Sequence, residues 1–286
     1  MKRSINMPDT YNYSYETFQF RHSLDRHPKD SDFKMHVHEQ YEIFYYISGE
    51  AHYLVEGTEY PLEPGYLLLM RPTESHRIKI LADKPYERFT LHFLPSLFDM
   101  LDPSHRLLAC FENRPLGKQN LYLPTEFHSG YPIDLFTAMS KPIVDPEAKR
   151  LDVLIHSLSL LSLIGRAFEK KQLKEKDCAP EDVSEEIVGY INRHLFEELS
   201  LEFLGKHFFM SSSQLGRLFK KTTGSSVWEY ILIKRLMAVR SLIRSGIPIC
   251  KAAFDCGFHD YSAFYRAYTK KFGVSPKKDA SVWSEK

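Results

Sequence analysis

An internal repeat in the last third of this 286-residue chain narrows the range of folds that it can adopt. LGKHFFMSSSQLGRLFKKTTG at 204–224 is followed by the similar AAFDCGFHDYSAFYRAYTKKFG at 252–273. Four pairs of residues match at an offset of 49: Leu215 and Phe264, Arg217 and Arg266, Phe219 and Tyr268, and Gly224 and Gly273. Each copy predicts a short helix, a tight turn and a second helix with apolar residues on one side and basic residues on the other. The repeat therefore predicts an all-α domain with two helix-turn-helix units, at about 201–222 and 249–272.

The segment between the two copies, SSVWEYILIKRLMAVRSLIRSG, predicts an amphipathic helix that joins them rigidly. Two units held in this way can dock on successive turns of the DNA major groove, about 34 Å apart. The alternative is a plain helical domain that arose by duplication and does not touch DNA.

Charge is distributed unevenly along the chain. The formal net charge is +1, but from Leu201 onward 15 Lys and Arg stand against 6 Asp and Glu. The first 200 residues carry 23 Lys and Arg against 31 Asp and Glu. Although a solvated basic face would give the same count, a basic segment on an acidic remainder favours a polyanionic partner for the last third alone.

Length and composition indicate two globular domains. With 43% hydrophobic residues, the chain is long enough for about two domains of roughly 100–200 residues each. No apolar run approaches the roughly 18 residues that a membrane span needs, and the start, MKRSINMPDTYNYSYE, lacks the apolar part of a secretory signal. The four cysteines, Cys110, Cys178, Cys250 and Cys256, include no C-x-x-C pair, which favours reduced thiols in the cytoplasm over a disulfide framework or a zinc site.

Residues 18–94 predict short β-strands. YEIFYYI, AHYLVEG and GYLLLM are rich in apolar and aromatic residues and are bounded by turns at Gly49, Gly57 and Pro64-Gly65. Several short strands at close spacing are typical of an antiparallel sandwich or barrel. The tyrosine-rich segment TYNYSYETFQF before them is either the first strand or an arm that closes over a ligand.

Beyond this β region the pattern becomes helical. Apolar residues recur at helical spacing from 148 to 171: Leu151, Leu154, Ile155, Leu158, Leu161, Ile164 and Phe168. This stripe is broad enough to pack on one element and on a partner chain, so we expect it to form a homodimer interface. The polar segment KKQLKEKDCAPED that follows predicts a linker. The expected organisation is an amino-terminal domain over 1–171, a linker over 172–183 and a DNA-binding domain over 184–282.

The last hundred or so residues resemble the DNA-binding domain of the AraC/XylS family of bacterial transcription regulators. The second unit matches the family signature at Ile249, Ala253, Gly257, Phe258, Ser262, Phe264, Arg266, Lys270, Gly273 and Pro276. The first unit matches at Leu201, Leu204, Met210, Ser211, Leu215, Arg217, Phe219, Lys220, Gly224, Tyr230, Arg235 and Ala238. Departures are Gly205 in place of the usual alanine, Tyr268 and Thr269 in place of phenylalanine and lysine, and Asp279-Ala280 in place of the closing Tyr-Arg.

This resemblance implies which side chains touch DNA. The base-reading residues lie at the exposed start of each second helix: Ser212, Ser213, Gly216 and Arg217 in the first unit, and Asp260, Tyr261, Ser262, Tyr265 and Arg266 in the second. Four lysines are expected to bind phosphates, which sets affinity and salt dependence rather than sequence preference: Lys220, Lys221, Lys270 and Lys271. Because Arg217 and Arg266 are equivalent, each either bonds guanine O6 and N7 or holds a phosphate or a carboxylate.

A second motif lies in the amino-terminal half. HVHEQYEIFYYISG supplies His36, His38 and Glu42, and His76 follows on a later strand. This residue pattern is similar to the two cupin motifs. In a strand, His36 and His38 would point to the same face. With Glu42 and His76 they could enclose a divalent metal such as iron, manganese or zinc. The second motif is incomplete, because Tyr66 replaces the usual aspartate.

The same H-x-H…Y-E spelling is frequent in the sensor domains of AraC-like regulators, whose pocket usually holds a small organic effector without metal. We therefore expect an effector pocket lined by His36, His38, Glu42, Tyr53 and His76, with no metal and no cofactor. Aromatic faces would stack on a sugar ring there, while His and Glu would bond its hydroxyls. Some of these histidines could instead hold strand hydrogen bonds or line an empty barrel.

Together these features predict an α+β chain of two domains: a cupin-like antiparallel β-barrel with a helical dimerisation segment, and an all-α double helix-turn-helix domain. The resemblance implies a cytoplasmic, non-enzymatic transcription regulator, and activation is the commoner behaviour of the family. The expected partners are double-stranded promoter DNA, a small effector such as a carbohydrate, a second copy of the chain and RNA polymerase, and not a membrane. The main alternative is a metal-dependent cupin enzyme with a helical appendage. A further alternative is a DNA-binding protein whose barrel only dimerises.

Overall fold

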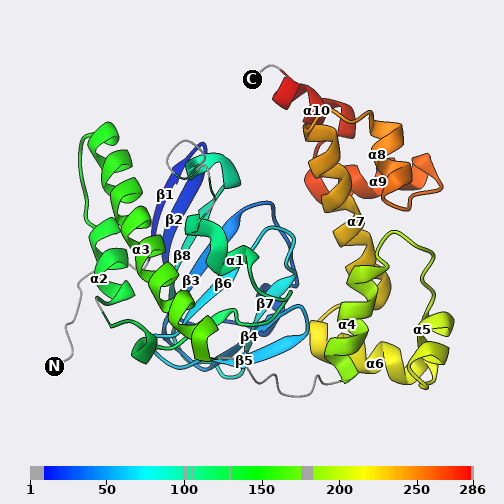
Figure 1. Cartoon of the computed structure of the whole chain (residues 1–286), viewed down its shortest axis with the longest axis horizontal. Helices are drawn as coiled ribbons and strands as arrows, with labels where there is room; N and C mark the ends of the chain where they lie inside the picture. Colours follow the sequence, from blue (N-terminus) through cyan, green and yellow to red (C-terminus); the bar gives the residue numbers. More distant parts are fainter. Residues whose placement is uncertain are drawn as a thin grey trace. The chain divides into compact units, whose positions relative to one another are not determined.

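The computed structural model describes residues 10–98, 102, 104, 106–128, 130–174 and 183–284. They form two compact units, an amino-terminal one built mainly of β-strands and a carboxy-terminal one built of helices (Figure 1). The predicted fold class, α+β with two domains, is confirmed. The predicted linker falls largely on 175–182, which lie outside the described residues.

The strands of the amino-terminal unit form two antiparallel sheets. Their order is β1-β2-β8-β3-β6-β9 in the larger sheet and β5-β4-β7 in the smaller one. The strands are β1 (Thr10–Tyr15), β2 (Phe18–Asp25), β3 (Tyr41–Ser48), β4 (Ala51–Val55), β5 (Thr58–Pro61), β6 (Leu67–Met70), β7 (His76–Ile80), β8 (Tyr86–Phe93) and β9 (Leu121–Tyr122). The predicted strands YEIFYYI, AHYLVEG and GYLLLM correspond to β3, β4 and β6. Because β1 pairs with β2 along its whole length, the tyrosine-rich segment is the first strand and not a free arm.

Strand β3 is buried on both faces between β8 and β6. Ile43 packs with Phe136 in a core between the larger sheet and the helices, whereas Phe44 packs with Tyr53 in a second core that includes residues of the smaller sheet. Since successive side chains of a strand alternate between its faces, Glu42 lies on the same face as Phe44. The strand thus places a carboxylate between the two sheets.

The helical elements of this unit pack on the outer face of the larger sheet (Figure 1). They are α1 (Ala109–Glu112), α2 (Pro132–Met139) and α3 (Pro146–Lys174). Short 3-10 turns lie at Asp30–Asp32, against β7 of the smaller sheet, and at Pro95–Phe98, Arg106–Leu108 and Pro124–Glu126. Helix α3 is longer than the predicted 148–171 and takes up residues 172–174 of the predicted linker. In the described part of the chain it is the one helix long and apolar enough to cross a membrane, but its Val153, Leu160 and Leu161 are fully buried in the core of this unit.

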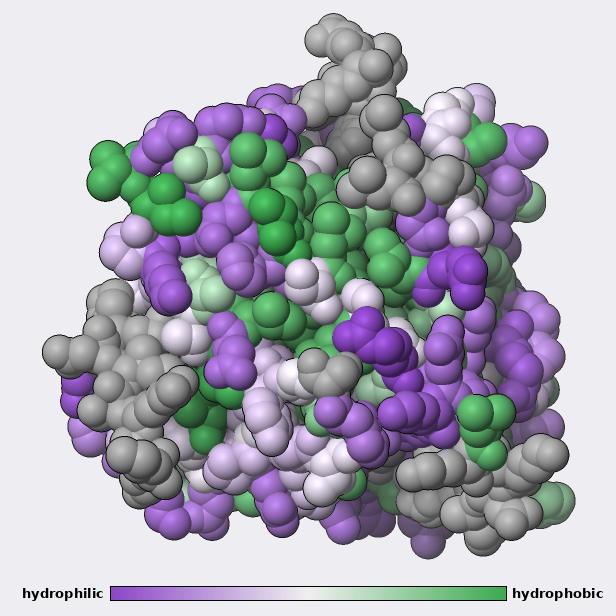
Figure 2. All heavy atoms as spheres, turned by 60° about the vertical axis from the view of Figure 1, so that its left-hand side comes forward, coloured by the Kyte–Doolittle hydropathy of each residue, from purple (hydrophilic) through white to green (hydrophobic). Residues whose placement is uncertain are grey.

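The predicted apolar stripe of α3 divides between two faces. Leu161, Ile164 and Phe168 are buried against the sheet, whereas Leu151 and Ile155 are 47% and 59% exposed. The two exposed residues lie one turn apart and leave an apolar strip on the outer face of the helix. In Figure 2, which brings the side of α2 and α3 forward, hydrophobic side chains gather among hydrophilic ones.

The carboxy-terminal unit consists of α4 (Val183–Arg193), α5 (Leu201–His207), α6 (Ser212–Thr223), α7 (Val227–Arg244), α8 (Ile249–Asp255), α9 (Tyr261–Phe272) and α10 (Pro276–Ser284). The pairs α5–α6 and α8–α9 are the two predicted helix-turn-helix units, and α7 is the predicted connecting helix. Helix α7 contributes Tyr230 and Ile231 to a hydrophobic core with α4–α6, and Leu236 and Val239 to a second core with α8 and α9. It therefore runs through both halves of the unit.

Candidate DNA-binding surface and sensor site

Local signals fix the first helix-turn-helix unit. Ser200 caps α5 and Ser211 caps α6, because each hydroxyl accepts a hydrogen bond from the backbone N–H three residues on. The Gln214 side chain accepts from the Ser211 N–H and completes a capping box. Gly205 allows a close approach in the turn, since an added Cβ would lie 2.7 Å from the Met210 carbonyl oxygen. The sequence thus sets both the turn and the start of α6.

In the second unit the acidic residue at the start of α9 has a local role. Asp260 Oδ1 accepts hydrogen bonds from the backbone N–H groups of Ser262 at 2.8 Å and Ala263 at 3.1 Å. This carboxylate is therefore engaged as the helix cap, a role that was not predicted for it although Asp is a favoured capping residue. Phe264 and Tyr268 of α9 are fully buried, as the repeat predicts.

The other side chains expected to touch DNA lie on the outer faces of α6 and α9. Nine are exposed: Ser213, Arg217, Lys220, Lys221, Tyr261, Ser262, Tyr265, Arg266 and Lys270. Ser212 and Gly216 are half-buried, and the Ser212 hydroxyl donates to the Leu201 carbonyl oxygen at 3.4 Å. Lys271 is also half-buried, and burial lowers its pKa. Each second helix thus presents a polar and basic face of the kind that a DNA groove accepts.

Asp279 of α10 is a buried polar centre that was not predicted. Its carboxylate accepts hydrogen bonds from Arg240 Nε at 2.7 Å, Arg244 Nη2 at 2.8 Å and the Tyr268 hydroxyl at 2.8 Å. Burial alone would raise the pKa of Asp279, but these hydrogen bonds outweigh it and the pKa is lowered. The one signal in the sequence was that Asp279 stands where the family has its closing Tyr-Arg.

Replacing Asp279 with asparagine should lower the free energy of unfolding of this unit at pH 7 by about 1.5–3 kcal/mol, since charged hydrogen bonds are lost. Because the folded-state pKa lies below the ordinary value, the stabilisation is present above the unfolded-state pKa of about 3.9. It is lost as the pH falls through the folded-state pKa. Urea denaturation followed by tryptophan fluorescence measures the effect, since Trp228 and Trp283 both lie in this unit. A difference between variant and native chain that stays constant on acidification would contradict the prediction.

In the amino-terminal unit, Glu42 is the centre of a polar cluster between the two sheets. It is 3% exposed, and its Oε1 accepts a hydrogen bond from the Tyr53 hydroxyl at 3.2 Å. Its Oε2 lies 3.2 Å from His76 Nε2 and 3.1 Å from His92 Nε2. Burial would lower the pKa of His76, but the hydrogen bond and the charge of Glu42 outweigh it and raise the pKa. His92 was not predicted; it stands opposite Glu42 on β8.

His36 and His38 lie in an irregular segment before β3, and the expectation that they share the face of a strand is wrong. Within 33–40 only His36 makes an isolated β-bridge, so the two-residue alternation of a strand does not apply. Their ring centroids nevertheless lie 6.0 Å apart. One ligand atom from each of His36, His38, Glu42 and His76 lies within 4.8 Å of the other three. The structure thus brings together all five residues predicted for the effector pocket, including Tyr53.

This donor set also fits a metal ion, the alternative that the sequence left open. Three imidazoles and one carboxylate are ligands that zinc, iron and manganese accept in proteins. Glu42 and His76 are buried, whereas His38 is half-buried and His36 is exposed. The cluster is therefore reachable from one side.

A hollow of the same unit lies away from this cluster. A cavity of about 900 Å³ is lined by residues of β9, of the segment after it and of α3, among them Leu121, Leu123, Ala167, Lys170 and Lys171. The five residues predicted for the effector pocket are not among those that line it. The Lys171 ammonium group donates to the Leu121 carbonyl oxygen at 2.7 Å, so this lysine ties α3 to β9.

A second buried charged group holds the loop between α1 and β9. Arg114 donates through both terminal nitrogens to the two Glu74 oxygens, each at 2.7 Å, and neither side chain is exposed. The Gly117 N–H and the Asn120 amide donate to the same carboxylate at 2.9 and 3.2 Å. Burial would raise the pKa of Glu74, but these donors outweigh it and lower the pKa. Nothing local in the sequence marks this ion pair.

Both units have relatives among known proteins. Residues 204–280 match the helix-turn-helix domain family, and residues 23–139 match the AraC-like ligand binding domain family. The HTH-type transcriptional regulator YfiF of Bacillus subtilis is 26% identical over 263 residues, which cover 88% of this chain and 80% of that protein. The HTH-type transcriptional activator RhaS of Escherichia fergusonii is 25% identical over 269 residues, which cover 87% of this chain and 90% of that protein. A solved structure of the DNA-binding domain of AdpA in complex with a target DNA is 24% identical, covers 37% of this chain and 96% of that chain, and gives a TM-score of 0.35.

Proposed function

Because the chain belongs to the AraC/XylS family of bacterial transcription regulators, we propose that it binds promoters through α6 and α9 and activates transcription when its amino-terminal unit binds a small effector. This rests on the observation that α6 and α9 present equivalent exposed basic side chains, Arg217 with Lys221 and Arg266 with Lys270. The name of the relative RhaS supports activation as the sign of regulation. A cytoplasmic location and a contact with RNA polymerase follow from this role.

Genome-wide mapping of the DNA bound by the native chain tests the proposal. We expect a small set of promoters that share a sequence with two recognition boxes, and reduced expression of the adjacent genes when the protein is deleted. The matched control is the double variant Arg217→Ala/Arg266→Ala, which should lose these sites. Binding without sequence preference, or genes whose expression rises on deletion, would contradict DNA reading or activation, respectively.

The proposed effector site is the cluster formed by His36, His38, Glu42, Tyr53 and His76. Imidazole and phenol groups can donate to or accept from a hydroxyl, and a carboxylate accepts from one, which suits a carbohydrate. The cluster joins both sheets, so a ligand there can favour one conformation of the unit over another. A ligand changes the population of two states only through its different affinity for them.

Replacing His38 with alanine should abolish the response to the effector and leave DNA affinity in its absence within about twofold. A thermal-shift screen against carbohydrates would first identify a ligand that raises the melting temperature of the native chain. The variant should then show no such rise. Loss of DNA binding as well would mean that His38 serves the fold rather than the ligand.

A divalent metal is a second candidate ligand, because four suitable donor atoms lie within 4.8 Å of one another. His36, His38, Glu42 and His76 would hold it, and it would supply a positive charge that attracts an oxygen atom of a second ligand. Elemental analysis of the purified chain distinguishes the two candidates. About one equivalent of metal, lost in His76→Ala, would assign the cluster to an ion.

A homodimer through α3 is also part of the proposal. The exposed Leu151 and Ile155 on the outer face of this helix support it. Burial of such an apolar strip against a second copy removes it from water.

A further inference from the structure

Arg235 in the middle of α7 binds to both halves of the carboxy-terminal unit. Its Nε donates to the Leu195 carbonyl oxygen at 2.8 Å and its Nη2 to that of Glu197 at 2.6 Å, both in the segment that leads into α5. Its Nη1 donates to the Gly257 carbonyl oxygen at 2.8 Å, in the turn between α8 and α9. One side chain thus joins the entry of the first helix-turn-helix unit to the turn of the second.

The chemistry of this contact requires arginine. Arg235 is 8% exposed, and no carboxylate pairs with it among the described residues. A planar guanidinium carries five N–H donors in a fixed fork, so it reaches three carbonyls at once, whereas a lysine ammonium offers a single compact charge. A buried cation held only by backbone carbonyls has a positional role rather than a role in binding a carboxylate partner.

The turn of the second unit is shaped to receive this side chain. Gly257 has a φ of +81°, a conformation that favours glycine. A Cβ at this position would lie 2.7 Å from the Phe196 carbonyl oxygen and 3.0 Å from Arg235 Cζ. The backbone of the second turn therefore touches both Arg235 and the segment before α5.

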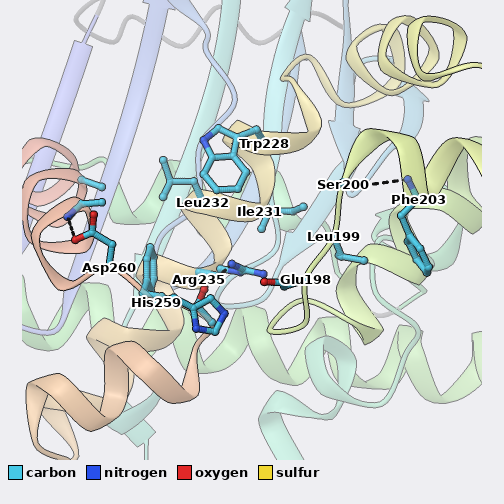
Figure 3. A pocket seen from close by; sticks show the side chains of 14 residues that line it. Glu198, Leu199, Ser200, Phe203, Trp228, Ile231, Leu232, Arg235, His259 and Asp260 are labelled. Atoms are coloured by element: carbon cyan, nitrogen blue, oxygen red, sulfur yellow. Dashed lines mark hydrogen bonds between the residues drawn. The ribbon is translucent and has the colours of Figure 1, made fainter.

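Beside these contacts, a groove lies between the two halves. It has a volume of about 760 Å³, and Figure 3 shows Arg235 in it between residues of the two halves, Glu198 and His259. In the described part of the unit the halves have separate hydrophobic cores that meet at α7. The groove leaves open space beside α7, so side chains do not fill the whole region between the halves.

We propose that Arg235 is a positioning residue that holds α6 and α9 at one fixed separation and so sets the spacing of the two DNA boxes that one chain can read. The proposal goes beyond DNA binding itself, which comes with the family. Two modules at a fixed separation bind a two-box site with a high effective concentration for the second box. If the hydrogen bonds of Arg235 are removed, α7 still connects the halves, but the orientation of one half relative to the other varies. The gain in affinity at one particular box spacing is then reduced.

The test is a spacing series on DNA, with the full-length chain. The probe is a duplex of about two helical turns that the native chain selects from a randomised library. Further duplexes carry one box only, or single base pairs added between the boxes up to about half a turn. The variants are Arg235→Met, Arg235→Lys, which keeps the charge, and Gly257→Ala, which keeps Arg235 but obstructs the contact. The control is Arg193→Met, because Arg193 is exposed on α4 and its loss changes the charge equally.

For the native chain and the control, affinity should fall steeply as soon as the spacing changes. For Arg235→Met and Gly257→Ala, affinity for the selected duplex should fall at least tenfold and the dependence on spacing should flatten, with single-box affinity within about twofold of native. Arg235→Lys should show an intermediate affinity for the selected duplex and an intermediate dependence on spacing. If Arg235→Met lacks the native unfolding transition in tryptophan fluorescence, Arg235→Lys serves as the test in its place. A steep, native dependence on spacing in the variants overturns the proposal. So does an equal loss on single-box and two-box DNA, which would mark Arg235 as a residue of one half only.

Discussion

Replacing Arg114 with methionine is expected to lower the free energy of unfolding of the amino-terminal unit by about 3–5 kcal/mol. The substitution leaves the Glu74 carboxylate fully buried without the cation that donates to both of its oxygens. Arg71 Nε, at 3.8 Å from Glu74 Oε1, and the Gly117 and Asn120 donors remain, but the buried carboxylate loses its two shortest charged hydrogen bonds, and the folded state bears that cost. Urea denaturation followed by far-ultraviolet circular dichroism measures the loss.

The double variant Glu74→Leu/Arg114→Met is the matched control. Replacement of a whole buried ion pair by apolar side chains is often neutral or stabilising, so it should recover most of the loss. Tryptophan fluorescence supplies a second control, because Trp228 and Trp283 report on the other unit and its transition should not move. A double variant as unstable as Arg114→Met would show that the size and shape of these side chains, and not their charge, stabilise the fold.

The second large effect is expected at Arg266, which is exposed on α9. Arg266→Ala should weaken binding to the specific DNA site by about 1–3 kcal/mol, or roughly 5- to 150-fold, and relax the preference at one base position. The reason is that arginine can donate two hydrogen bonds to guanine O6 and N7, which alanine cannot replace. Competition binding with a set of single-base variants of the site measures both changes.

Lys270→Ala is the appropriate comparison, because Lys270 lies one turn further along the same helix and is expected to bind phosphate. It should weaken binding to all DNA sequences about equally. The dependence of the affinity on salt concentration should fall by about one released counterion. If Arg266→Ala behaves in the same way, Arg266 holds a phosphate and its assignment as a base-reading residue is wrong.

The helical repeat could be read from the sequence because its signals are local. The position of α6 follows from the capping serine Ser211, the buried Leu215 and Phe219 one turn apart, and Gly224 at its end. The strands β3, β4 and β6 were predicted for the same reason, since alternating or continuous apolar runs bounded by glycine need no knowledge of their partners.

Long-range polar partners could not be predicted. Arg114 lies 40 residues after Glu74, and Asp279 lies 39 residues after Arg240, with no periodicity that connects them. His92 joins Glu42 only through the pairing of β8 with β3. Such groups become recognisable once the register of the strands and the packing of the helices are known.

One expectation failed because its pattern is compatible with two conformations. The H-x-H spelling of His36 and His38 suits a strand, but an irregular segment brings the same rings together. The apolar stripe over 148–171 predicted a helix correctly. Its periodicity does not show which of the apolar residues pack against the sheet and which, like Leu151 and Ile155, are exposed.

The position of Glu42 also determines how β3 can pair. A shift of this strand by one residue would turn Glu42 from the space between the sheets to the helical core around Phe136, and would bring Ile43 to the histidines. Most of β3 is apolar on both faces and would tolerate such a slip, but a carboxylate moved away from Tyr53, His76 and His92 would be buried without donors. The same side chain that lies at the centre of the polar cluster therefore also fixes the register of the sheet, and the cluster is complete only in the correctly paired fold.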